Sequence, residues 1–287
     1  EILVLLGAMA AAAAGKEEEE LTSAPWGPVG RSFVLGATAL VAQVYLDVFN
    51  TTKVHNVKKL YEHLYTRPKG EGLLTVSNHI STVDDPSLFC AFLPLSFFFT
   101  EHEHERTRWT MCAKEFCFKN AVLSAYFQNG KVLPIERGLG LGQPTVSALT
   151  HKLSQGDWVH IFPEGKISRT QKLGPMKWGT AKILCEGEVD KADPIVLPFY
   201  HKGLDKVLPI GSKVPRVGQK NTVVVGEPVE FGDLLQRCKK NHQKRKESKG
   251  GEDSRLEQRE KQYYREIMDK IGKSLLGLEK ECESLHK

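Results

Sequence analysis

The sequence predicts an α/β protein with a mixed, mostly parallel central sheet flanked by helices. Two observations carry this prediction. From residue 51 to residue 236, short apolar segments alternate with segments of helical spacing, which is typical of sheets whose strands are joined by helices. An apolar run precedes this range and an amphipathic run follows it. They predict an N-terminal membrane-associated helix and a C-terminal amphipathic helix.

The chain begins with a low-complexity segment. Residues 1–30 contain an alanine run and four consecutive glutamates without a periodic apolar face, so we predict a poorly ordered tail. In the apolar run that follows, residues 33–49, Asp47 is the only charged residue. This run is slightly short for a bilayer-spanning helix, and the nearby Trp26 is typical of a membrane interface. We predict a shallowly inserted, membrane-associated helix over residues 31–50, with a buried core helix as the alternative.

Residues 51–236 form the predicted α/β domain. Residues 72–77 are a short apolar run between turn residues, which is typical of a buried strand. Pro86 is then expected to start a helix with Asp85 as its N-cap. Strands are predicted at residues 72–77, 131–137, 157–165, 194–203 and 221–229, and helices at residues 87–93, 109–127, 144–156 and 179–187.

The composition changes near residue 237. Residues 237–254 are charged and contain a glycine pair, which predicts a solvated linker. Residues 255–287 predict an amphipathic helix, because apolar residues recur at spacings of three, four or seven. They are Leu256, Tyr263, Ile267, Ile271, Leu275, Leu278, Cys282 and Leu285. We expect this apolar face to pack onto the core, and binding of a membrane or a partner is the alternative.

Charge and cysteine content restrict the function classes. A net charge of +5 and a pI of about 8.8 suit anionic partners such as phospholipid headgroups or nucleic acid. The basic run at residues 239–246 lies in the predicted linker, so no nucleic-acid partner is expected. Six irregularly spaced cysteines without a CxxC pair predict buried thiols or a reducing compartment rather than a disulfide framework. In EHEHER, residues 101–106, Arg106 replaces the second histidine of the HExxH zinc motif, so no metal site is expected.

The stretch SNHISTVDDPS, residues 77–87, is the strongest candidate for chemistry. On one helix His79 and Asp84 would lie about 140° apart. They can meet if His79 ends a strand, Asp84 precedes the next helix and the chain folds back between them. Asp84 would then fix one ring nitrogen and leave the other to accept a proton. Asp85 has the N-cap role available, so Asp84 is assigned to His79; a capped turn without catalytic function is the alternative.

Two later stretches place further polar residues after predicted strands. Arg137 ends the strand in GKVLPIERG and could bind a phosphate or carboxylate, or form a surface ion pair with Glu136. Pro198 interrupts a buried strand in PIVLPFYHKG, and His201 follows it.

A third stretch, WVHIFPEGK, combines a strand with a sharp break. Pro163 ends the strand and presents Glu164, Gly165 and Lys166. A glycine at this place permits close approach of a ligand to the backbone. A plain turn is the alternative interpretation.

Together these stretches resemble the glycerolipid acyltransferase superfamily. His79 and Asp84 match its H-x-x-x-x-D motif, residues 130–137 its second block, residues 162–165 its FPEG block, and Pro198 its fourth block. The resemblance covers residues 50–232 and implies that the α/β domain is an acyltransferase domain. Many members have Thr-Arg after FPEG, whereas this chain has Lys166-Ile167, which is similar to the mitochondrial phospholipid transacylases that remodel cardiolipin.

The resemblance implies roles for individual residues. His79 would act as general base on a lysophospholipid hydroxyl, oriented by Asp84. The substrate-binding residues that it implies are Arg137, Phe162, Pro163, Glu164, Gly165 and Lys166. Among these, Arg137 would hold the lipid phosphate, and Glu164 and Gly165 would position the headgroup glycerol.

The reaction implied by the resemblance is acyl transfer at a membrane surface. A phospholipid would donate the acyl chain to a lysophospholipid such as monolysocardiolipin, without a cofactor, on a mitochondrial membrane facing the intermembrane space. An acyl-CoA-dependent lysophospholipid acyltransferase has the same residues and differs only in its donor, so it stays open. A non-catalytic lipid-binding protein on this fold would be expected to lack the histidine or the aspartate, and both are present.

Overall fold

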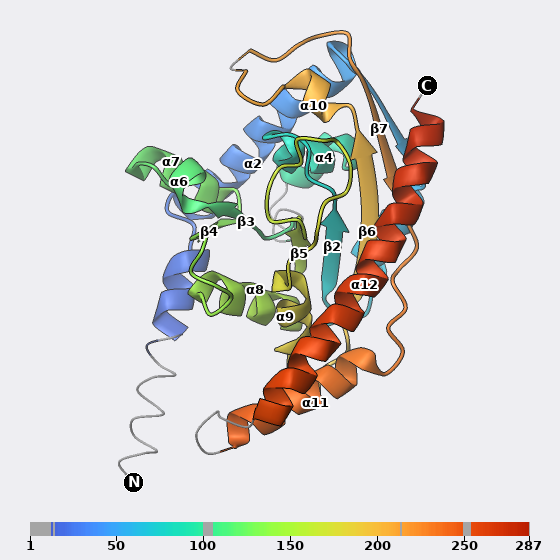
Figure 1. Ribbon diagram of the computed structural model, residues 1–287. Helices are drawn as coiled ribbons and strands as arrows, with labels where there is room; N and C mark the ends of the chain where they lie inside the picture. Colours follow the sequence, from blue (N-terminus) through green and yellow to red (C-terminus); the bar gives the residue numbers. More distant parts are fainter. Residues whose placement is uncertain (1–12, 14, 100–105, 213, 249–253, 287) are drawn as a thin grey trace.

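The computed structural model describes residue 13 and residues 15–99, 106–212, 214–248 and 254–286. Its central sheet has five strands in the order β1-β7-β6-β2-β5 (Figure 1). These strands are β1 Thr51–His55, β2 Leu73–Ser77, β5 Trp158–Ile161, β6 Ile195–Lys202 and β7 Lys220–Val225. Strands β6 and β7 are antiparallel, and every other neighbouring pair is parallel. The prediction of a mixed, mostly parallel sheet is confirmed.

Helices cover both faces of this sheet (Figure 1). They are α2 Gly27–Gln43, α3 Val57–Tyr65, α4 Asp84–Phe92, α8 Pro144–Ser154, α9 Gly179–Cys185, α11 Leu234–Glu247 and α12 Ser254–Leu285, with the short α10 Leu204–Val207 after β6. Successive strand side chains point to opposite faces. Leu74 and Val159 therefore pack with α8, α9, α11 and α12. Their neighbours Leu73 and Trp158 pack with α2, α3 and α4.

Residues 109–127 do not form the single helix predicted for them. Thr110–Ala113 form β3, which pairs in parallel with β4 Val132–Ile135, and the helices α6 Lys114–Cys117 and α7 Ala121–Asn129 follow β3. Asn120 starts α7 as a new helix, because its side chain accepts a hydrogen bond from the Leu123 amide at 3.0 Å. The prediction was wrong because apolar spacing alone does not separate a short strand from a helical turn.

Helix α2 presents an apolar face outward. Its opposite face packs on α4 and on the short 3₁₀ helix Leu95–Phe98. The outer side chains of Val29, Phe33 and Val41 are 84%, 68% and 69% exposed. With its π-helical continuation Val44–Val48, the helix has 22 residues and a mean hydropathy of 1.4, which is long and apolar enough to cross a membrane. This helix suggests membrane association.

The N-terminal boundary differs from the prediction. Helix α2 begins at Gly27 rather than at residue 31, and residues 15–22, inside the predicted tail, are helical. Contacts with distant residues hold this first segment: Leu21 packs against the core, and Glu18 lies 2.5 Å from the ring of His151 on α8. These contacts join distant parts of the sequence, so local composition did not predict them.

The predicted linker over residues 237–254 is largely helical. Helix α11 extends from Leu234 to Glu247 and buries Cys238, Lys239 and His242, while residues 249–253 lie outside the described residues. Two of its polar side chains are paired in the interior, whereas Arg237, Lys240, Lys244 and Lys246 are exposed. Lys239 lies 2.7 Å from Asp193, and His242 lies 2.7 Å from Glu260.

Helix α12 confirms the favoured use of the C-terminal amphipathic pattern. It crosses the sheet beside β6 and β7 as the long red helix of Figure 1. Its buried side chains include Ile267, Ile271, Leu275 and Leu278, which are four of the predicted apolar positions. This face therefore belongs to the core.

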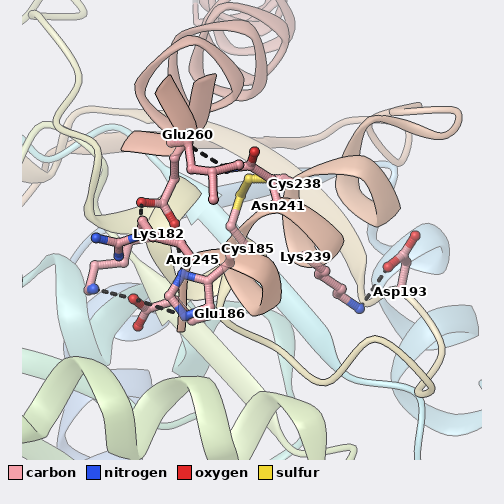
Figure 2. Close-up of a disulfide and its surroundings, with 11 residues drawn as sticks. Lys182, Cys185, Glu186, Asp193, Cys238, Lys239, Asn241, Arg245 and Glu260 are labelled. Carbon is pink, nitrogen blue, oxygen red and sulfur yellow. Dashed lines mark hydrogen bonds and ion pairs between the residues drawn. A yellow bond between two sulfur atoms is a disulfide. The ribbon is translucent and has the colours of Figure 1, made fainter. Parts of the chain in front are cut away.

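Two cysteine pairs correct the expectation of thiols. Cys112 is bonded to Cys117, and Cys185 to Cys238, whereas Cys90 and Cys282 are free and buried. Figure 2 shows the disulfide between Cys185 on α9 and Cys238 on α11, next to the charged residues Lys182, Glu186, Arg245 and Glu260. The pairing attaches the C-terminal helices to the α/β core.

Loss of the Cys185–Cys238 disulfide should destabilise the fold. The bond joins residues that are 53 apart in sequence, and closing a loop of that length stabilises a protein by about 3–4 kcal/mol. We expect the Cys185→Ala/Cys238→Ala variant to lose free energy of unfolding in this range, as measured by urea denaturation. Cys282→Ala, which removes a buried sulfur without breaking a bond, is the control. Unchanged wild-type stability after addition of a reductant would contradict the prediction.

Candidate active site

His79 and Asp84 meet at the carboxyl end of β2. The strand ends at Ser77, α4 begins at Asp84, and the chain folds back between them. His79 Nδ1 lies 2.8 Å from Asp84 Oδ2. The other ring nitrogen, Nε2, has no hydrogen-bond partner among the described residues. A histidine held in this way can donate Nδ1–H to the carboxylate and accept a proton at Nε2.

Asp84 is the centre of the turn. Its side chain is fully buried, and Oδ2 also accepts hydrogen bonds from the amides of Ile80, at 2.7 Å, and Ser81, at 2.9 Å. These bonds explain why the chain folds back. Asp85 has the extended backbone of an N-cap residue directly before Pro86, with φ −106° and ψ 121°, but its carboxylate pairs with Arg108. The assignment of Asp84 to His79 agrees with the geometry, and Asp85 lies at the predicted N-cap position, but among the described residues its carboxylate binds Arg108 rather than a helix amide.

Phe162 sets the plane of the histidine ring. The two rings are stacked, with centroids 4.0 Å apart and an angle of 15° between their planes. The His160 ring packs edge to face against Phe162, with ring centroids 4.6 Å apart. The sequence singled out Phe162 only as part of the FPEG block, without this contact.

Glu164 contacts the backbone of His79 and does not line the cavity that the His79 ring faces. The residue is buried, and its carboxylate accepts hydrogen bonds from the amides of His79, at 3.0 Å, and Gly174, at 2.9 Å. Burial raises the pKa of this carboxyl group, against the lowering effect of the two amides. The headgroup role predicted for Glu164 does not fit this position. The geometry gives it the task of holding the His79 backbone.

His79 opens into a cavity of about 1070 Å³. Its wall contains the other substrate-binding residues named from the sequence: Arg137, Phe162, Pro163, Gly165 and Lys166. Side chains of α2, α4, α6 and α7 provide much of the apolar remainder, among them Leu35, Phe89, Phe116 and Phe127. A largely apolar cavity of this size can hold acyl chains, and the basic side chains offer partners for an anionic headgroup.

Arg137 and Gly165 occupy different parts of the wall. The Arg137 guanidinium lies 5.1 Å from the centre of the Phe116 ring and 3.5 Å from the carboxylate of Glu115, rather than pairing with Glu136. Gly165 has a φ of +61°, and a Cβ atom there would lie 2.9 Å from Cδ of Lys177. The FPEG turn thus requires glycine at this position.

The acyltransferase family model matches residues 51–202, a range that contains the His79–Asp84 turn and the FPEG stretch. The chain belongs to the acyltransferase family. It is similar to tafazzin of Drosophila melanogaster, with 33% identity over 256 residues that cover 89% of this chain and 62% of the fly protein. This confirms the resemblance predicted from the motifs, and this acyltransferase spans less than two thirds of the length of the fly relative.

Two further similarities concern a plant protein and a bacterial structure. An N-acylphosphatidylethanolamine synthase of Arabidopsis thaliana is 36% identical over 212 residues, which cover 71% of this acyltransferase and 72% of the plant protein. The crystal structure of PlsC, a 1-acyl-sn-glycerophosphate acyltransferase of Thermotoga maritima, has a TM-score of 0.47 and 19% identity. That similarity covers 77% of this chain and 82% of the bacterial chain.

Sequence reasoning missed Arg108 in the wall of the acyltransferase cavity. The side chain is buried, pairs with Asp85, donates to the Gly130 carbonyl at 3.0 Å, and lies 5.1 Å from the Phe89 ring centre. It follows the EHEHER run, of which residues 101–105 lie outside the described residues. Only the tertiary fold brings Arg108 to the turn that carries His79.

A second buried cation of the acyltransferase, Lys131, lies near Arg108. Its ammonium group is 3.3 Å from the Thr107 carbonyl and 5.0 Å from the centre of the Trp109 ring. Burial, against the opposing charge of Asp157, lowers the pKa of Lys131 to about 7.

This shift predicts a pH-dependent stability. Between pH 7 and the ordinary lysine pKa of 10.5, the unfolded chain holds a proton on Lys131 that the folded chain has released. The contribution of Lys131 to the free energy of unfolding therefore increases with pH across that window. The free energy of unfolding is measured with urea at pH 7 and at pH 9. We expect the change from pH 7 to pH 9 to be less favourable to the folded state in Lys131→Met than in the wild type, because the variant lacks the Lys131 contribution. Equal changes in the two proteins would contradict the prediction.

Proposed function

We propose that this acyltransferase is a phospholipid–lysophospholipid transacylase with His79 as its general base. The observation that carries the proposal is His79, which lies in the wall of an apolar cavity with basic side chains and has its Nδ1 2.8 Å from the buried Asp84 carboxylate. A lysophospholipid hydroxyl is a weak nucleophile, so it needs a base within hydrogen-bond reach. The residues at the site supply such a base, a carboxylate to orient it, and room for acyl chains.

The proposed reaction has two steps around one tetrahedral intermediate. The acceptor hydroxyl gives its proton to Nε2 of His79 while its oxygen attacks the ester carbonyl of the donor phospholipid. The intermediate then collapses, the ester bond of the donor breaks, and the imidazolium returns the proton to the departing glycerol oxygen. Asp84 stabilises the imidazolium between the two steps, as the aspartate of a catalytic triad does. Arg137 and Lys166 would attract the phosphate of the lipid.

The proposed substrates follow from the similarity to tafazzin. We propose that monolysocardiolipin is the acceptor and that the product is cardiolipin, made without a cofactor on a mitochondrial membrane facing the intermembrane space. The exposed apolar face of α2 would hold the protein in the bilayer, close to its lipid substrates. The mitochondrial location rests on the resemblance to the mitochondrial transacylases.

A second candidate function is N-acylation of phosphatidylethanolamine. It is favoured by the 36% identity to the Arabidopsis thaliana N-acylphosphatidylethanolamine synthase, of which the chain covers 72%. In this reaction the nucleophile would be the amine of the headgroup instead of a glycerol hydroxyl. The same base would serve both acceptors, so the geometry of the site does not select between them.

The test is a comparison of donors and acceptors with the wild-type protein on vesicles. Labelled phosphatidylcholine without CoA and labelled acyl-CoA are the donors, and monolysocardiolipin and phosphatidylethanolamine are the acceptors. Transfer from phosphatidylcholine to monolysocardiolipin is the expected result. Transfer from acyl-CoA alone would make the protein a CoA-dependent acyltransferase. Product formed only with phosphatidylethanolamine would support the second candidate.

A further inference from the structure

His201 is a buried histidine that the proposed mechanism does not use. It lies on β6, which pairs with β2 in parallel up to Phe199 beside Ser77 and then continues for three residues. This continuation carries His201 next to the turn that holds His79. The side chain of His201 is fully buried.

Three hydrogen bonds join His201 to Asn78, the residue before His79. The Asn78 side chain donates to the His201 carbonyl and accepts from the His201 amide, both at 2.9 Å. The third bond is made by the imidazole, whose Nε2 lies 2.9 Å from the Asn78 carbonyl oxygen. A carbonyl only accepts, so Nε2 carries the proton. Burial lowers the pKa of His201, which favours this neutral form.

The third bond acts on the peptide unit that carries His79. This peptide unit joins Asn78 to His79. The Asn78 carbonyl accepts a hydrogen bond from the His201 ring, and the His79 amide donates one to the Glu164 carboxylate at 3.0 Å. Both polar groups of one peptide are therefore held by buried side chains. On the next peptide, the His79 carbonyl accepts from the Ser168 amide at 2.7 Å. The backbone of His79 is thus fixed on both sides, while Asp84 fixes the ring and also lies 3.7 Å, through Oδ2, from His201 Nε2.

We infer that His201 is a positioning residue, which holds the Asn78–His79 peptide through its Nε2–H and so places the His79 ring for proton transfer. The inference rests on the proposed function, because it gives His79 the role of general base. His201 does not line the cavity and so has no contact to offer the substrate. It should therefore affect kcat and leave KM unchanged.

Two amide variants separate positioning from mere packing. A glutamine side chain can place its N–H near the position of Nε2, whereas an asparagine side chain reaches only the position of Nδ1. We expect His201→Asn to lower kcat for transfer to monolysocardiolipin by up to about 10²-fold, the effect of a misplacement near 1 Å. His201→Gln should restore most of that loss, and KM should be unchanged in both. Equal kcat values for the two variants, or a change confined to KM, would overturn the inference.

Controls separate stability and the proposed function from the inference. His242 on α11 is also buried but lies in another charged cluster, so His242→Asn should lower the unfolding temperature and leave kcat unchanged. If His201→Asn does not fold, His201→Gln is compared with His201→Met, which has no N–H to donate to the Asn78 carbonyl; kcat should be lower for His201→Met with KM unchanged, and equal kcat values would overturn the inference. Wild-type activity in His79→Ala would refute the proposed function itself. An inactive His79→Ala beside a fully active His201→Asn would refute only the inference.

Discussion

Replacement of His79 by alanine is expected to lower kcat for acyl transfer by about 10²–10⁴-fold, the contribution of a positioned general base. The ring is held by Asp84 at 2.8 Å and stacked on Phe162, so no other group takes its place when it is removed. His160 and His201 are nearby, but both are buried behind the turn and their pKa values are lowered by burial. The measurement is the initial rate of label transfer from phosphatidylcholine to monolysocardiolipin on vesicles.

The control for this variant is His63→Ala. His63 lies in the last turn of α3, outside the cavity wall, and its replacement should leave kcat unchanged. Circular dichroism should show the same helix content for both variants as for the wild type. A His79→Ala protein that is folded and transfers acyl chains at the wild-type rate would mean that His79 is only a turn residue.

The change Asp84→Asn should have an effect of similar size, up to about 10⁴-fold in kcat, as for the aspartate of a catalytic triad. Asparagine keeps an oxygen that can accept from the amides of Ile80 and Ser81, so the turn should form. It loses the negative charge that stabilises the imidazolium.

The distinguishing measurement for Asp84→Asn is the pair of kcat and KM values. Asp84 is fully buried and does not line the cavity, so KM should stay near the wild-type value while kcat falls. A thermal unfolding curve close to that of the wild type would show that the loss is not a loss of fold. An increase in KM with kcat retained would show that Asp84 serves substrate binding, which contradicts the assigned role.

Local sequence patterns predicted four of the five strands of the central sheet and missed the edge strand β1, whose side chains are exposed or half-buried. Strands β2, β5, β6 and β7 are buried apolar runs bounded by turn residues, so the pattern and the structure agree. The errors occur where distant contacts decide the outcome. Thr110–Ala113 form a strand because β4 pairs with them, and α11 buries Lys239 and His242 because Asp193 and Glu260 pair with these two side chains. Neither partner can be identified from local spacing.

In the candidate site, too, local contacts were predicted and contacts between distant residues were not. His79 and Asp84 are five residues apart, and a turn was enough to predict that they meet. Glu164 lies 85 residues after His79, and its bond to the His79 amide depends on the packing of β5 beside β2. Arg108 reaches the site in the same way. Contacts between strands therefore decide which residues support the His79 turn. A motif indicates that a residue such as Glu164 matters but does not show what it contacts.

The central claim is that His79 and Asp84 act as one catalytic unit, and the double variant His79→Ala/Asp84→Asn tests it most directly. If Asp84 acts only through the His79 ring, removing both should cost no more than removing His79 alone. We predict that the double variant and His79→Ala transfer acyl chains from phosphatidylcholine to monolysocardiolipin at the same residual rate. Losses that multiply in the double variant would contradict the claim, because Asp84 would then act on the reaction independently of His79.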